Sequence, residues 1–321
     1  MVDLLNLQPT TISRDLRSKY LLIYSQPKAG KTSFAASLPN NLIFSFEIGT
    51  NALSGIYALP ITKWSELKLA VKQLEKPEVQ AKFHTVTFDT VGIAYGLCEK
   101  YICAQNGVQS ISDIPWGRGY AMVKQEFEET LRKNSMMGLG IILIAHSSRR
   151  VEKQSDDSEI EFFSPDLDKR CYSIVNQLVD IIGYIDVRFK EDGTSERFLY
   201  TRRTPTVMAG SRWKYLDPVI PFGYQELVDA IGRAIERSEK DDGAVVVDNR
   251  TPVIQEERSF EEIEAEARDL WSKAVSKDER NAERIMEIVE KIFGQKMKLS
   301  NITPAQKDLY EVVVAEMRDL V

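Results

Sequence analysis

The chain has 321 residues, 43% of them hydrophobic, which is long enough for one sizeable core and a smaller appendage. It carries 42 basic and 48 acidic residues, a net charge of −6, but 14 of the basic and 21 of the acidic ones fall in 236–321. Residues 1–235 therefore carry +1, so the overall acidity does not exclude nucleic-acid binding by this larger part. An odd set of three cysteines argues against a disulfide framework, and no apolar run approaches the roughly 18 residues of a membrane span, so we expect a soluble, cytoplasmic protein without membrane contact.

Strand patterns and helix patterns alternate along the first half of the chain. Four short runs are almost continuously apolar, as strands buried on both faces of a parallel sheet must be: 20–24, 42–46, 85–88 and 140–145. Segments with helical spacing lie between them, at 31–38, 64–75, 91–104 and 120–133. The alternation predicts an α/β fold with a mainly parallel sheet covered by helices on both faces.

The pattern changes after residue 145. Residues 147–157 are polar and charged, with no apolar period, and we interpret them as a mobile loop. A helix at 169–179 should follow, then two strands, 180–189 and 197–201, joined as a hairpin by a turn at 191–193.

The last third of the chain contains a composition break. A closing helix is expected at 224–237, and Asp-Asp-Gly and Thr-Pro then mark a linker at 240–257. Amphipathic patterns at 260–275, 279–293 and 303–320 predict a small helical region. The expected organisation is an N-terminal segment (1–19), a main domain (20–239), the linker and a helical C-terminal region (258–321).

The first strand and helix flank a loop that resembles the phosphate-binding pattern Gly-x4-Gly-Lys-[Ser/Thr]. The loop and its next residue read Ser25, Gln26, Pro27, Lys28, Ala29, Gly30, Lys31, Thr32 and Ser33. In such loops backbone N–H groups wrap the phosphates, the lysine reaches the β- and γ-phosphates, and the hydroxyl ligates Mg²⁺. We therefore expect ATP and Mg²⁺ here, although Ser25 replaces the first glycine of the pattern.

Three polar residues end neighbouring strands of the predicted sheet. Asp89 should hold the metal or its water together with Thr32, Glu47 should orient the attacking water, and His146 should face the γ-phosphate. Each has a plainer alternative: a helix cap for Asp89, a turn residue for Glu47 and a buried, satisfied histidine for His146.

In this order and spacing, the residues resemble a known family. Pro-Lys-Ala-Gly-Lys-Thr, Phe-Glu-Ile-Gly around Glu47, Phe-Asp-Thr-Val around Asp89, Trp-Gly-Arg-Gly-Tyr at 116–120 and Ile-Ala-His at 144–146 are similar to those of phage nucleotide-binding proteins among the RecA-like P-loop ATPases. The resemblance implies a RecA-like core that hydrolyses ATP in a homo-oligomeric ring or filament. It also implies work on single-stranded DNA in phage recombination or replication, beside a phage annealing or single-strand-binding protein.

The resemblance also implies a basic residue that reaches the neighbouring subunit's γ-phosphate. Arg212 is the candidate, with Arg202 and Arg203 behind it, and a plain surface arginine is the alternative. DNA contact needs cations along a path, and we assign it to Arg118, Arg149, Arg150 and Lys153, although a solvated loop of mixed charge would have the same composition.

Two further functions remain open. A P-loop kinase would use residues 147–157 as an arginine-bearing lid over a small acceptor. A nucleotide switch without hydrolysis would position a partner through the C-terminal helices, and Glu47 would then be incidental.

Overall fold

The computed structural model describes residues 12–13, 16–47, 49, 53–153, 159–247 and 258–321. The chain divides into two compact units, one spanning 9–254 and the other containing 255–321. The dividing point lies within the linker expected at 240–257, but the first residues of that stretch belong to the larger unit. There α7 (Tyr224–Asp242) runs past residue 239, and β12 (Val246–Val247) pairs in parallel with β1 (Ile12–Ser13). No helix among the described residues has the length and apolar character needed to cross a membrane.

A ten-stranded, mainly parallel sheet forms the centre of the larger unit, which confirms the α/β fold class. The strand order is β11-β9-β8-β2-β6-β5-β3-β4, with β10 paired to β8 and β7 to β6. Six strands run parallel: β2 (Tyr20–Ser25), β3 (Asn41–Ser45), β4 (Tyr57–Pro60), β5 (Thr85–Asp89), β6 (Gly140–Lys153) and β8 (Ile181–Phe189). The other four are antiparallel to their neighbours: β7 (Glu159–Pro165), β9 (Ser195–Tyr200), β10 (Gly210–Ser211) and β11 (Val219–Pro221).

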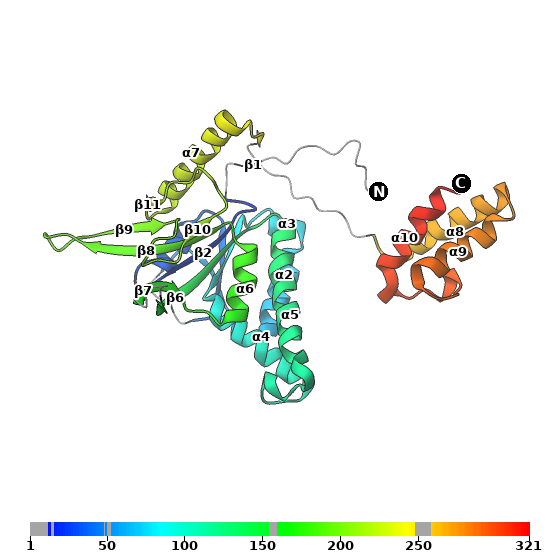
Figure 1. Ribbon diagram of the computed structural model, residues 1–321, viewed down its shortest axis with the longest axis horizontal. Coiled ribbons are helices and arrows are strands. Elements are labelled where there is room, and N and C mark those ends of the chain that lie inside the picture. Colours follow the sequence, from blue (N-terminus) through cyan, green and yellow to red (C-terminus); the bar gives the residue numbers. More distant parts are fainter. Residues whose placement is uncertain (1–11, 14–15, 48, 50–52, 154–158, 248–257) are drawn as a thin grey trace. The chain divides into compact units, whose positions relative to one another are not determined.

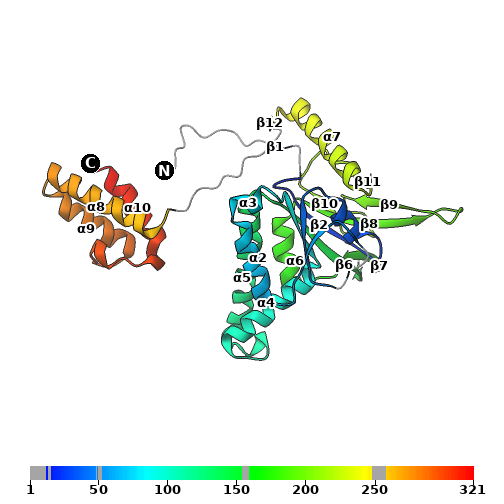
Figure 2. The same ribbon diagram turned by 180° about the vertical axis from the view of Figure 1, so that it is seen from behind.

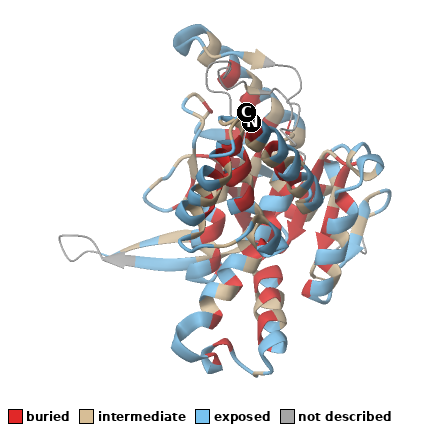
Figure 3. Cartoon of the chain, turned by 90° about the vertical axis from the view of Figure 1, so that its right-hand side faces the viewer, coloured by how far each residue is buried: buried red, intermediate tan, exposed pale blue. Residues whose placement is uncertain are grey.

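Helices cover both faces of this sheet (Figures 1 and 2). One face packs against α2 (Trp64–Leu74), α4 (Val91–Asn106), α5 (Arg118–Met136) and α6 (Lys169–Leu178), and the short α3 (Pro77–Gln80) follows α2. The other face packs against α1 (Lys31–Ser37) and α7. Figure 3 shows buried residues along the strands and on the helices that cover them. Both faces of the central strands are therefore inaccessible to water, which is why their sequences are almost continuously apolar.

The expectation of a loop at 147–157 is wrong for residues 147–153. These residues continue β6 beyond the sheet and pair with β7 in an antiparallel hairpin, with Arg150 opposite Phe162. Residues 154–158 lie outside the described residues. The sequence did not predict this extension because its side chains are polar. Each strand of the hairpin has only one other strand to pair with, so its two faces need not both be apolar.

The hairpin expected at 180–189 and 197–201 is confirmed as β8 and β9. Tyr184 of β8 pairs with Tyr24 near the end of β2, and β8 continues for five more residues to Phe189. The hairpin therefore extends past the carboxyl edge of the parallel sheet, and its projection is visible in Figure 1. This brings β9 beside the loop that follows β2.

The smaller unit is a three-helix assembly with its own apolar core. Its helices are α8 (Phe260–Lys277), α9 (Asn281–Phe293) and α10 (Lys307–Arg318), and short 3₁₀ turns at Leu299–Asn301 and Pro304–Gln306 precede α10. Ser259 begins α8 with a capping box in which its hydroxyl accepts from Glu262 N–H and the Glu262 carboxylate accepts from Ser259 N–H. Tyr310 and Met317 are among the core residues that are almost fully buried.

Candidate functional site

The predicted phosphate-binding loop joins β2 to α1 at the carboxyl edge of the sheet. Gly30 immediately precedes α1 with a φ of 99°, in the left-handed region that favours glycine. Within the loop Gln26, Pro27 and Lys28 are exposed and Ala29 is buried, while Ser33 is exposed on the first turn of α1. The loop thus has the strand, turn and helix setting that phosphate binding through backbone N–H groups requires.

Lys31 is buried and folded back onto the start of the loop. Its Nζ donates to the Ser25 backbone oxygen at 3.1 Å, to Ser25 Oγ at 3.0 Å and to the Gln26 backbone oxygen at 3.0 Å. Burial lowers the pKa of Lys31, and the nearby carboxylates of Asp89 and Glu47 oppose that shift. The ammonium group is therefore held between neutral acceptors that a phosphate could replace.

These contacts give the departure from the glycine pattern a physical reason. Ser25 is fully buried, is the last residue of β2 and has no positive φ, so its backbone does not require glycine. Its hydroxyl donates to the Gln26 backbone oxygen at 2.9 Å and accepts from Lys31. The side chain that weakened the motif match is part of the lysine's binding site.

Thr32 and Asp89 form the second pair of the site. Thr32 Oγ1 donates to Asp89 Oδ2 at 2.6 Å, and Asp89 is 7% exposed at the end of β5. Burial raises the pKa of Asp89, with the Glu47 carboxylate adding to the rise, whereas the Thr32 hydrogen bond and the charges of Lys31 and His146 oppose it. A positive charge beside this carboxylate would offset the cost of its burial.

The oxygen pair fits a magnesium ion that arrives with a nucleotide. Mg²⁺ prefers oxygen ligands and is usually held by one or two protein oxygens together with phosphate oxygens and water. Throughout the described ranges, no three His, Cys, Asp or Glu side chains gather into a metal-binding group. A hydroxyl and a single carboxylate beside the phosphate-binding loop match this partial coordination.

Glu47 and His146 meet next to this pair. Glu47 Oε1 accepts a hydrogen bond from Thr90 Oγ1 at 3.0 Å and lies 3.3 Å from His146 Nε2. Oε2 has no hydrogen bond to any described residue, and the Glu47 side chain is 35% exposed. One oxygen therefore fixes the carboxylate, and the other remains accessible. Thr90, which the sequence analysis did not assign to the site, supplies one of the two fixing contacts.

Strand register explains why these residues converge. Asp89 pairs with Ser45, two residues before Glu47, and also with Ile144, two residues before His146. His146 in turn pairs with Ser25 at the start of the loop. The carboxyl ends of adjacent parallel strands thus bring four distant stretches of sequence to one edge of the sheet.

Arg212 lies at the other end of the sheet. It follows β10, which pairs with the first residues of β8, and its guanidinium Nη1 donates to Asp180 Oδ1 at 3.2 Å. Its Nη2 also donates to the Gln177 backbone oxygen. Arg202 similarly donates to backbone oxygens of Ser211 and Trp213. Both arginines thus hold the turn around β10 in this chain, and the arginine-finger assignment stays a prediction.

The four predicted DNA-contact residues belong to two different parts of the fold. Arg149, Arg150 and Lys153 lie on the β6–β7 hairpin, where Arg149 and Arg150 are exposed, whereas the Lys153 side chain is outside the described part. Arg118 is the first residue of α5 and lies two residues after Trp116, which is 96% exposed. Arg149 lies 5.5 Å from the Phe163 ring centroid, so this hairpin combines a cation with an aromatic face.

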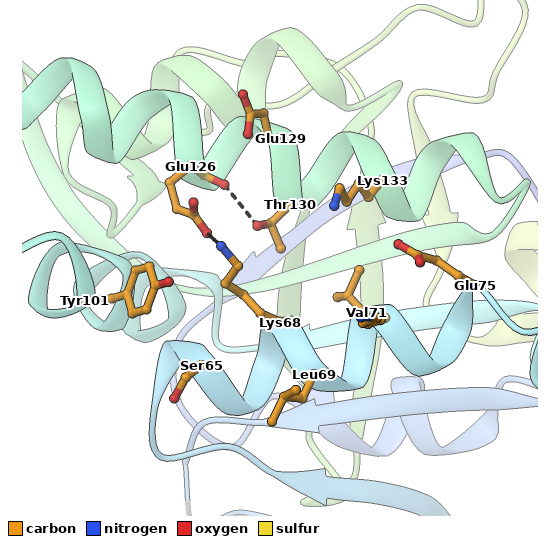
Figure 4. A pocket seen from close by; sticks show the side chains of 11 residues that line it. Ser65, Lys68, Leu69, Val71, Glu75, Tyr101, Glu126, Glu129, Thr130 and Lys133 are labelled. Atoms are coloured by element: carbon orange, nitrogen blue, oxygen red, sulfur yellow. Dashed lines mark hydrogen bonds and ion pairs between the residues drawn. The ribbon is translucent and has the colours of Figure 1, made fainter. Parts of the chain in front are cut away.

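A separate cavity of about 530 Å³ opens between α2 and α5 (Figure 4). None of the residues assigned to nucleotide binding lines it. Lys68, at its centre, is paired with Glu126 at 2.8 Å and lies 5.2 Å from the Tyr101 ring centroid. Its cation is thus already neutralised by a carboxylate.

Two comparisons relate the chain to known proteins. Over 328 aligned residues the chain is 27% identical to the SPbeta prophage-derived uncharacterized protein YorG of Bacillus subtilis (strain 168), covering 99% of this chain and 98% of that protein. An AAA domain family matches residues 17–213, a region that begins before β2 and includes the phosphate-binding loop, Glu47, Asp89 and His146. Because this match covers more than half of the chain, the protein belongs to the AAA domain family of nucleotide-binding P-loop ATPases.

Proposed function

We propose that the protein is an ATP-hydrolysing, RecA-like enzyme that acts on single-stranded DNA in phage recombination or replication, in the cytoplasm of a bacterial host. The observation that carries the hydrolytic part is the convergence of Lys31, Thr32 with Asp89, and Glu47 with His146 at one sheet edge. Family membership supports ATP binding, and the similarity to a prophage-derived protein supports a phage origin.

Lys31 binds the β- and γ-phosphates after it exchanges its contacts with Ser25 and Gln26 for phosphate oxygens. Thr32 and Asp89 would hold Mg²⁺, which when bound neutralises charge on the phosphates. The buried setting strengthens these electrostatic contacts relative to water.

Glu47 orients the attacking water and accepts its proton. A general base needs an accessible lone pair and a fixed position, and Oε2 supplies the first while the contacts of Oε1 supply the second. His146 contacts that same carboxylate and continues directly into the β6–β7 hairpin. A change at the γ-phosphate can therefore reach the hairpin through a single strand.

The β6–β7 hairpin is the proposed DNA contact, with Arg118 as a further cation. The surface pair of Arg149 with Glu161, at 3.8 Å and with both side chains more than half exposed, is worth little in water, so a DNA phosphate can replace Glu161. Aromatic and arginine side chains together favour single strands, whose bases are free to stack. We further propose a homo-oligomer, ring or filament, that works beside a phage annealing or single-strand-binding protein, with Arg212 reaching the neighbouring subunit.

The test is ATP hydrolysis with and without single-stranded DNA. We expect hydrolysis that DNA stimulates, loss of nucleotide binding in Lys31→Ala, and a fall in kcat of about 10²–10⁴-fold in Glu47→Gln with nucleotide still bound, as for loss of a general base. Arg149→Ala combined with Arg150→Ala should remove the DNA stimulation. Glu75→Gln, an exposed carboxylate at the end of α2, is the matched control.

The outcomes distinguish the alternatives. Nucleotide binding without hydrolysis under any condition would favour the switch, and phosphoryl transfer to a small acceptor would favour the kinase. The kinase alternative required residues 147–157 to act as a lid over the acceptor. Residues 147–153 instead form a paired strand, which argues against that role. Hydrolysis that is unaffected by DNA would remove the DNA part of the proposal and leave the ATPase part.

A further inference from the structure

Arg197, on the β8–β9 hairpin, lies against the phosphate-binding loop of its own chain. The three heavy atoms nearest to a Cβ atom built on Gly30 all belong to this side chain, at 3.3 Å for Nη1, 3.5 Å for Cζ and 3.7 Å for Nε. Three guanidinium atoms at nearly equal distances mean that the flat face of the group covers Gly30. Its N–H edges consequently point past the loop.

The hairpin holds Arg197 in this place through backbone and ring contacts. Arg197 pairs with Val187, three residues beyond the Tyr184 to Tyr24 pair, which places it about 10 Å past Tyr24 at about 3.3 Å per residue. The Arg197 backbone oxygen accepts a hydrogen bond from Phe222 N–H at 2.8 Å. The Phe222 ring stacks on Phe34 of α1, with centroids 4.9 Å apart. The strand that carries Arg197 is thereby tied to the helix that follows the loop.

Within the described part of the chain, the guanidinium of Arg197 has no counter-charge of its own. It is exposed and makes no hydrogen bond or ion pair with any described residue, whereas its hairpin neighbours Arg188, Lys190 and Glu196 are all paired. An arginine that lies over the backbone of a phosphate-binding loop and has no partner among the described residues is suited to a phosphate group, whose oxygens accept from two parallel guanidinium N–H donors.

We propose that Arg197 contacts the α- and β-phosphates of a nucleotide bound to the loop of the same chain. The position of Gly30 sets this choice, because in such loops the backbone around the glycine cradles these phosphates, while the lysine reaches toward the γ-phosphate. Arg197 is then a binding residue for ADP and ATP alike, and not a residue that acts only on the transferred phosphoryl group. This inference rests on the proposed nucleotide binding.

The test is calorimetric titration of the full chain with Mg·ADP and with a non-hydrolysable Mg·ATP analogue. Arg197→Ala should weaken both by the same factor, about tenfold or more, as expected for loss of hydrogen bonds to a charged group. Arg197→Lys should recover part of the loss, since it keeps the charge without the forked donors. Lys190→Ala is the matched control, because it removes one positive charge from the tip of the same hairpin and should change affinity less than twofold.

Other results would overturn the proposal. Unchanged or tighter binding by Arg197→Ala would mean that the side chain merely covers Gly30 in the free protein. A fall in kcat with unchanged ADP affinity would place it at the γ-phosphate instead. An equal loss of nucleotide affinity in Lys190→Ala would show that the effect comes from the net charge of the hairpin and not from Arg197 in particular. If the wild-type protein binds no nucleotide, the proposed function itself fails. If it does bind nucleotide, and Lys31→Ala abolishes this binding while Arg197→Ala leaves it unchanged, only the inference about Arg197 is refuted.

Discussion

Substitution of Ser25 by alanine should change stability and nucleotide affinity in opposite directions. The change removes one of three acceptors of the buried Lys31 ammonium and the donor to the Gln26 backbone oxygen. A hydrogen bond to a charged group contributes about 1.5–3 kcal/mol, and the lower end applies because Lys31 keeps two carbonyl acceptors. The free protein should therefore lose about 1.5 kcal/mol, which lowers Tm by a few degrees for a domain of this size.

The same loss should favour binding. Lys31 must leave Ser25 to reach the phosphates, so an interaction present only in the free state opposes nucleotide binding. Its removal should tighten Mg·ADP binding about tenfold, since about 1.4 kcal/mol corresponds to a factor of ten. The assays are thermal unfolding and calorimetric titration, with Ser37→Ala as control, because among the described residues the Ser37 hydroxyl bonds only the Phe34 backbone oxygen on α1. Weaker nucleotide binding by Ser25→Ala would refute the reasoning and show that the hydroxyl also serves the bound state.

Two other predictions follow from the buried carboxylate and from the separate core. Because burial raises the pKa of Asp89, its carboxylate should protonate as pH falls at a value above the usual 3.8, and the affinity for Mg·ADP should weaken there. Titrations from about pH 8 downwards should show this fall begin above the usual value of 3.8 in the wild type but not in Asp89→Asn, and a wild-type affinity that stays constant down to that value would contradict it. In the smaller unit, Met317→Ala empties a fully buried position and should cost about 2–5 kcal/mol of that unit's stability, measured by thermal unfolding. Nucleotide affinity should stay unchanged, and its loss would argue against independent units.

The sequence predicted those features that depend on local pattern. The continuous apolar runs of β2, β5 and β6 identified strands buried on both faces, and Gly30, Lys31 and Thr32 identified the loop between strand and helix. Since parallel strands end at one edge, the sequence also indicated that Glu47, Asp89 and His146 could meet. It did not identify the second half of β6, because polar side chains on a hairpin outside the core leave no apolar period to recognise.

Only the tertiary structure decided which side chains touch. Ser25 looked like a defect in a glycine pattern until the position of Lys31 gave its hydroxyl a role. Thr90 became a partner of Glu47 through the pairing of neighbouring strands. Arg197 is 167 residues from Gly30 and reaches it because β8 extends past the sheet and returns as β9. The local sequence pattern indicates which residues are buried, because apolar residues recur with the period of a helix or a strand. Contacts between distant residues depend instead on strand order and register, which no local pattern encodes.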